Sequence, residues 1–231
     1  MEIYNILQAL IYSFNKNSIR NAVVNNLPYN KDKYVWKGTF ILNRNTPFQE
    51  YRRWNLQNNN IYLFTVAYVY QENNVHYVAF IFNPNKKEIL CFDPGYNLYL
   101  YGKHKIIPMI VNELYAKKLI DEPIILKGKC PRKKFGLQWN GQQSTAKSPL
   151  PADSFCQIWT LFFIVNYLKH NGTMCFFQEW CQVRPKWREY FVIQQFILPS
   201  LQTIPCLKRS YGKKKLDMLH QYLNSNFWSK I

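Results

Sequence analysis

Residues 155–168 form an almost unbroken apolar segment, and this segment constrains the fold more than any other part of the chain. It begins in the run PADSFCQIWTLFF, where Asp153 or Ser154 is a good helix N-cap. It ends before Lys169–Gly172, a sequence typical of a helix C-terminus. We therefore predict a buried helix over residues 155–168, with Cys156 in its first turn.

The chain is long enough to bury a large core. Its 231 residues are 48% apolar and 17% aromatic, which indicates one domain of about 200 residues with appendages. We expect no secretory signal, and no apolar run is long enough to cross a bilayer. The six cysteines lack the paired spacing of a zinc site or a disulfide framework, so a reducing intracellular setting is expected.

Three strands are predicted in close succession, over Ile61–Tyr70, Val75–Phe82 and Glu88–Phe92. All three are enriched in β-branched and aromatic residues, which favour strands. The breaks between them, Glu72–Asn74 and Asn83–Asn85, have the composition of turns. We therefore expect an antiparallel meander at the centre of a sheet.

The remaining elements predict an α+β architecture, with helices segregated on either side of a small sheet. Residues 1–60 are polar and rich in Asn, and we interpret them as an N-terminal extension packed on the core. Residues 61–231 then form the main domain, including basic C-terminal helices. Helices are predicted over Ile3–Phe14, Lys105–Lys118, Phe176–Gln182, Trp187–Leu198 and Lys213–Phe227, and a short strand over Pro123–Lys127.

Three side chains on these elements form a candidate catalytic site. Cys156 lies where the free amides and the positive end of a helix favour a thiolate. His76 lies on a predicted strand, and Asp93 follows seventeen residues later at the end of the next strand. If these strands are neighbours, Asp93 can accept a hydrogen bond from the imidazole and orient it. The set is typical of a nucleophile, a base and an orienting carboxylate.

Each of these residues also has a purely structural interpretation. Cys156 alone is typical of a core cysteine, His76 of a hydrogen-bonded sheet residue, and Asp93 of a turn. Cys91, two residues before Asp93, competes as a nucleophile but lacks a helix N-terminus, so we interpret it as structural. The combination of all three residues, in order and on suitable elements, favours catalysis.

The order His, Asp, Gln, Cys resembles the clan that unites SUMO-specific proteases with adenovirus protease. The run Asp153–Leu161 is most similar to the polyprotein-processing proteases of large cytoplasmic DNA viruses, such as African swine fever virus and poxviruses. The resemblance covers roughly Ile61 to Leu168 and implies a papain-like, circularly permuted cysteine protease fold. It implies that Cys156 is the nucleophile, that His76 is the general base and acid, and that Asp93 orients His76.

The oxyanion-binding glutamine departs from the pattern of this clan. It usually lies roughly six or seven residues before the cysteine, a region occupied here by Ser148–Leu150. The glutamines farther upstream are Gln138, Gln142 and Gln143. We favour Gln143, which requires a loop insertion before the helix. Tyr77 and Gln157 stand where cellular members commonly have Trp and Gly.

The chain carries a large positive charge, with 30 Lys and Arg against 13 Asp and Glu and a formal net charge of +17. Such a balance predicts an acidic partner, which can be nucleic acid, a phosphate-rich surface or an acidic protein. The basic runs are also typical of solvated faces, and interleaved aromatic residues favour nucleic acid. The candidate contacts are Lys129, Arg132, Lys133, Lys134, Lys213, Lys214 and Lys215. The resemblance implies that the chain needs no cofactor or metal. Because adenovirus protease uses DNA as an activator, the resemblance also implies that DNA or a peptide can activate this chain.

Three functions follow from these patterns. The first is a thiol protease that cleaves viral structural polyprotein precursors during virion maturation, after small residues such as Gly-Gly or Ala-Gly. The second is a protease that removes ubiquitin or a ubiquitin-like modifier from host proteins. The third is a basic nucleic-acid-binding or structural protein that keeps the scaffold without catalysis. We expect the first, as a monomer in the virion and in viral factories of the host cytoplasm.

Overall fold

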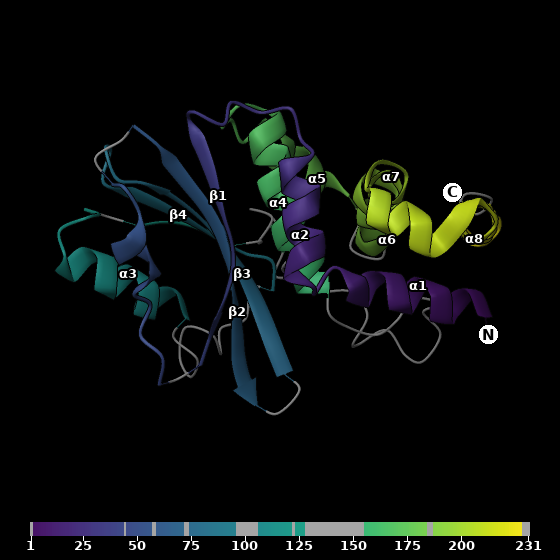
Figure 1. Cartoon of the computed structure of the whole chain (residues 1–231), viewed down its shortest axis with the longest axis horizontal. Helices are drawn as coiled ribbons and strands as arrows, with labels where there is room; N and C mark the ends of the chain where they lie inside the picture. The colour runs from purple at the N-terminus through teal and green to yellow at the C-terminus, as the bar shows by residue number, and fades with distance from the viewer. Residues whose placement is uncertain are drawn as a thin grey trace.

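The structure is a computed structural model that describes residues 2–43, 45–56, 59–71, 74–95, 106–121, 123–127, 155–183 and 187–227. In these residues the chain forms an α+β fold with helices on both faces of a mixed sheet (Figure 1). The sheet has the order β1-β2-β3-β4-β5, which is also the order of its strands in the sequence. The predicted α+β class is confirmed.

The centre of the sheet is the predicted antiparallel meander. It consists of β2 (Ile61–Gln71), β3 (Asn74–Asn83) and β4 (Glu88–Asp93), each within one or two residues of the predicted bounds. The outer strands β1 (Tyr34–Leu42) and β5 (Pro123–Lys127) pair in parallel with β2 and β4. The rigid middle of the sheet therefore holds the two strands that carry His76 and Asp93.

One face of the sheet is covered by α4 (Phe155–Lys169) and α2 (Asn17–Asn25), as Figure 1 shows. All residues of α4 from Phe155 to Val165 are buried, as expected for a helix that is apolar on all sides. The ring of Phe163 stacks on Phe92 of β4 at a centroid distance of 4.3 Å. Helix α4 is thus fixed against the sheet along its length, which positions its first turn.

The other face is covered by α3 (Ile106–Ala116) and by the segment around the short 3-10 helix η1 (Glu50–Arg53). Aromatic rings dominate this core: Phe64 stacks on Phe80 at 5.0 Å and on Phe48 at 5.3 Å. The sheet therefore separates two hydrophobic cores, one under α4 and one under α3.

The N-terminal region contributes more to the fold than the sequence indicated. Besides the expected helix, α1 (Glu2–Ser13), it contains α2 and β1, neither of which we predicted. The sequence of α2, NSIRNAVVN, is rich in residues of low helix propensity. In β1, Gly38 has φ +87° and lies within a register shift, which interrupts the alternating pattern of a strand.

The C-terminal region is helical, as predicted, and packs beyond α4 (Figure 1). It contains α5 (Cys175–Gln182), α6 (Arg188–Val192), a π-helix η4 (Ile193–Ile197), α7 (Leu198–Thr203) and α8 (Pro205–Phe227). Non-helical backbone at Gly212 divides α8, so its second part matches the predicted helix over Lys213–Phe227. In the described parts of the chain, every helix is too short or too polar to cross a membrane.

Candidate active site

His76 and Asp93 form a buried hydrogen-bonded pair on adjacent strands. The distance between His76 Nε2 and Asp93 Oδ1 is 2.8 Å, and the two side chains are 12% and 1% exposed. Asp93 Oδ1 also accepts a hydrogen bond of 2.8 Å from the backbone N–H of Gly95, in the turn after β4. The carboxylate is therefore held in place from two directions, and it fixes one nitrogen of the imidazole.

Cys156 lies beside this pair, in the first turn of α4. The pairing of β3 with β4 begins at Ala79 opposite Phe92, so β4 ends before it reaches the level of His76. At that level the thiol of Cys156 lies 3.9 Å from the carbonyl oxygen of Val75. Because Asp93 bonds to Nε2, the nitrogen of His76 that remains for Cys156 is Nδ1.

The charges around His76 favour its protonated form. Burial alone lowers the pKa of His76, but the Asp93 carboxylate and its hydrogen bond, together with Cys156, raise this pKa to about 10. At neutral pH the imidazolium is therefore the dominant form in this environment. An imidazolium that lies between a carboxylate and a cysteine can stabilise the thiolate form of that cysteine.

Several predicted site residues lie outside the described part of the chain. These are the glutamines Gln138, Gln142 and Gln143 and the basic residues Lys129, Arg132, Lys133 and Lys134. Of the predicted nucleic-acid contacts, Lys213, Lys214 and Lys215 are described, and all three are exposed on α8 just after Gly212. The structure thus brings together three of the four predicted catalytic residues and leaves the oxyanion glutamine as a prediction.

Two buried polar residues of the site were not predicted as site residues. Arg20 of α2 is completely buried and donates a hydrogen bond of 2.7 Å to the carbonyl oxygen of Gln157, next to Cys156. The side chain of Gln157 is also buried; its Oε1 lies 3.7 Å from the thiol, and its Nε2 has no partner among the described residues. A single arginine in an Asn-rich segment gave no signal of this position, because only the fold brings α2 to α4.

Two other thiols test the uniqueness of this arrangement. Cys91 is completely buried in β4, and burial raises its pKa, so the structural interpretation from the sequence fits its surroundings. Cys175 is exposed at the start of α5, with its sulfur 3.5 Å from Nδ1 of His170. Unlike His76, His170 forms no ion pair with an acidic side chain of the described residues. Among the cysteines in the described residues, only Cys156 lies beside a histidine that is hydrogen-bonded to a carboxylate.

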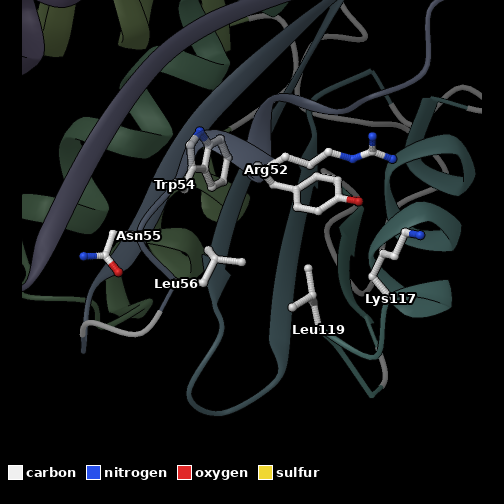
Figure 2. A pocket seen from close by; sticks show the side chains of 7 residues that line it. Arg52, Trp54, Asn55, Leu56, Lys117 and Leu119 are labelled. Atoms are coloured by element: carbon white, nitrogen blue, oxygen red, sulfur yellow. The ribbon is translucent and has the colours of Figure 1, made fainter.

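A pocket of about 610 Å³ lies on the other face of the sheet, away from these residues (Figure 2). Its lining comes from the segment around η1 and from the turn after α3: Tyr51, Arg52, Trp54, Asn55, Leu56, Lys117 and Leu119. Tyr51 donates one hydrogen bond to Glu113 of α3, and Arg52 forms an ion pair with the same carboxylate. None of the three clustered residues lines this pocket, so it is a feature of the α3 core.

No metal-ligand cluster accompanies the site in the described ranges, where no three His, Cys, Asp or Glu side chains gather suitably. The chemistry available to His76, Asp93 and Cys156 is nucleophilic attack by sulfur with proton transfer through the imidazole.

No protein-family model and no curated protein matches the chain. Among solved structures, the effector protein ChlaDUB of Chlamydia abortus is 18% identical, with a TM-score of 0.39, over 67% of this chain and 63% of that one. ChlaDub1 from Chlamydia trachomatis is 15% identical, also with a TM-score of 0.39, over 88% of this chain and 82% of its own. The chain thus aligns with less than two thirds of the Chlamydia abortus protein.

Proposed function

We propose that the chain is a cysteine peptidase in which Cys156 is the nucleophile, His76 the general acid and base, and Asp93 the residue that orients His76. One observation carries this proposal: a buried His76–Asp93 hydrogen bond of 2.8 Å lies against a cysteine in the first turn of a buried helix. The positive end of that helix and the raised pKa of His76 both favour a thiolate paired with an imidazolium.

The mechanism follows from these positions. The Cys156 thiolate attacks the scissile carbonyl, and the oxyanion accepts hydrogen bonds from a backbone N–H at the start of α4 and from a glutamine side chain, for which Gln143 stays the prediction. The His76 imidazolium then donates a proton to the leaving amine, which gives a thioester. The neutral imidazole next takes a proton from water, which hydrolyses the thioester and regenerates the thiolate.

The pKa of His76 suits both proton transfers. In the resting site the thiolate contributes to the raised pKa, so His76 begins as an acid. After acylation the sulfur is neutral, and this contribution to the pKa is lost. The imidazole is then a better match for the base that activates water at neutral pH.

For the substrate, we propose peptide bonds that follow small residues, such as Gly-Gly or Ala-Gly, in viral structural precursors. The sequence resemblance alone supports this choice, and neither of the two similar structures comes from a virus. The alternative is removal of ubiquitin or a ubiquitin-like modifier, which also presents a Gly-Gly terminus. The two substrate classes differ in whether a folded modifier must dock beside Cys156.

The test uses electrophilic probes that end in Gly-Gly, one built on full-length ubiquitin-like proteins and one on short peptides. We expect the wild type and Cys175→Ala to be labelled, and Cys156→Ala to be unlabelled. Cys175→Ala is the matched control, because it removes an exposed thiol that also lies beside a histidine. Undiminished labelling of Cys156→Ala would contradict the proposal, and failure of every probe would favour a non-catalytic scaffold.

The same experiment separates the substrate classes. Labelling by the short peptide probe supports processing of extended precursor segments. Labelling by the full-length modifier without labelling by the short peptide supports the alternative, because affinity then depends on the folded part of the modifier.

A further inference from the structure

A completely buried arginine lies beneath the first turn of α4. Arg20 donates hydrogen bonds from Nε to Thr39 Oγ1 at 2.8 Å and from Nη1 to the carbonyl oxygen of Gln157 at 2.7 Å. Its Nη2 donates to Thr65 Oγ1 at 2.9 Å and, at 3.4 Å, to Thr160 Oγ1. Arg20 thereby joins α2 to β1, β2 and α4, the elements that surround the start of the nucleophile helix.

All of these acceptors are neutral, so they satisfy the donors of Arg20 but leave its charge in place. Within the described ranges, no Asp or Glu forms an ion pair with Arg20. Burial lowers the pKa of Arg20 to about 10, and the negative forms of Tyr77 and Cys156 oppose this change. A buried charge without an opposite charge is costly, so its retention needs a counter-charge nearby.

Contacts through Tyr77 connect Arg20 to the thiol. The guanidinium of Arg20 lies over the ring of Tyr77, 5.1 Å from its centroid. Tyr77 in turn packs with Ala67 and Cys156 in a small buried cluster. The ring therefore contacts both the guanidinium and Cys156, and because Arg20 and Cys156 are buried, their electrostatic interaction is stronger than it would be in water.

Among the residues that the structure describes, the charges of the buried site balance when Arg20 is included. In those residues the titratable groups that face Cys156 are His76 and Tyr77 from β3 and Arg20 from α2, with Asp93 of β4 behind His76. In the proposed resting state, Asp93 and the thiolate are negative while His76 and Arg20 are positive, and Tyr77 is neutral. Without Arg20, the same cluster would carry one net negative charge in a buried environment.

We propose that Arg20 is a positioning residue that holds the first turn of α4 against the sheet and supplies the buried positive charge that stabilises the Cys156 thiolate. This inference rests on the proposed cysteine peptidase function. It makes α2, in the N-terminal region, part of the catalytic unit. It also gives the thiolate a source of positive charge that is independent of the proton on His76.

The test measures the rate at which iodoacetamide alkylates Cys156 at pH values from 5 to 9. Peptide mass spectrometry quantifies the alkylated cysteine at each time point. Replacement of Arg20 by a neutral side chain of similar length, Arg20→Met, should slow alkylation of Cys156 about tenfold at pH 6 and displace its rate curve toward higher pH. Arg20→Lys restores the charge without the planar fork and should recover most of the rate. A merely structural role would not produce this pattern.

Two controls accompany the measurement. Cys175 is an internal reference in every variant, because its thiol is exposed beside His170. Arg188→Met removes another completely buried arginine, in α6, and should leave the rate at Cys156 unchanged. If Arg20→Met does not fold, Arg20→Met with Thr65→Val removes an acceptor together with its donor, and the same tenfold loss is expected.

The outcomes separate this inference from the proposed function. A wild-type Cys156 that reacts at pH 6 no faster than Cys175 would overturn the proposed function itself. A fast wild-type Cys156 whose rate curve is the same in folded Arg20→Met would overturn the role of Arg20 and leave the function standing. Slower alkylation in Arg20→Met with recovery in Arg20→Lys supports both.

Discussion

At the scale of single residues, His76 shows how two opposing effects set one pKa. Burial disfavours the imidazolium, and the carboxylate of Asp93 at 2.8 Å favours it by more, so the pKa rises from the ordinary 6.5 to about 10. A raised pKa in the folded state stabilises the fold at every pH at which the folded imidazole is protonated. This stabilisation is full below about pH 6.5 and is lost as the pH rises through about 10.

Replacement of Asp93 should remove this pH dependence. In Asp93→Asn the main cause of the raised pKa is absent, so the free energy of unfolding should fall less between pH 6.5 and pH 10 than in the wild type. Urea denaturation at several pH values in this range measures the free energy of unfolding of each variant. Cys156→Ala is the control, because it retains the His76–Asp93 pair and most of the slope. Equal slopes for wild type and Asp93→Asn would contradict the assigned cause.

The catalytic residues predicted from the sequence needed only local patterns. Cys156 follows from a capped apolar helix, and His76 and Asp93 follow from two strands joined by a short turn, so neighbouring strands were expected. Arg20 needed the contact between α2 and α4, which are far apart in the sequence. Its hydrogen bonds to Thr39, Thr65 and Thr160 leave no periodic pattern in the chain.

At the scale of secondary structure, α4 has a defined end as well as a defined start. Asn171 and Gly172 both have positive φ, and the N–H of Gly172 donates a hydrogen bond of 2.8 Å to the carbonyl oxygen of Tyr167. The hydroxyl of Tyr34, at the start of β1, donates to Asn171 Oδ1 at 3.3 Å. The far end of α4 is thereby attached to β1.

Gly172 should tolerate substitution less well than a glycine of the same φ elsewhere. A Cβ at Gly172 would lie 2.6 Å from the hydroxyl oxygen of Tyr34, whereas at Gly38, with φ +87°, the nearest atoms are at 3.5 Å. We expect Gly38→Ala to lower the free energy of unfolding by about 1–2 kcal/mol through backbone strain, and Gly172→Ala by more. Urea denaturation compares them, and equal losses would show that the Tyr34 contact relaxes freely.

The elements that were not predicted have identifiable physical reasons. Strand β1 pairs in parallel with β2 through two segments separated by a register shift, so its alternation of buried and exposed residues is broken. The predicted helix over Trp187–Leu198 is helical throughout but contains a π-helical turn, Ile193–Ile197, which a 3.6-residue period does not reveal. The meander and α4 were predictable because their patterns are regular.

At the scale of the whole molecule, the two ends of the chain share one core. Phe14, after α1, is completely buried and lies against Phe196 of the π-helix, with ring centroids 5.7 Å apart. Figure 1 shows α1 beside α8, at the side of the molecule opposite to α3. The N-terminal region thus belongs to the core that supports α4, in addition to supplying a strand and Arg20.

The net charge of +17 gives a prediction about the surface of the molecule. We propose that the chain binds double-stranded DNA through the exposed Lys213, Lys214 and Lys215 of α8. Changing all three to Gln should then weaken the binding and reduce its dependence on salt, because each phosphate contact releases counterions. Fluorescence anisotropy across a salt series measures this. Changing the exposed but separated Lys16, Lys86 and Lys117 to Gln removes the same charge, and an equal effect from this control would exclude a local contact surface.

The strands of the sheet lie side by side in the order in which the ribosome makes them. As the chain emerges, each strand from β2 onward can add to a strand that is already present, and α2 with its arginine is synthesised before any of them. The cysteine of α4 is made after all five strands. Of the residues that supply the charges of the candidate site in the described part of the chain, Cys156 is therefore the last to be synthesised, after Arg20, His76 and Asp93.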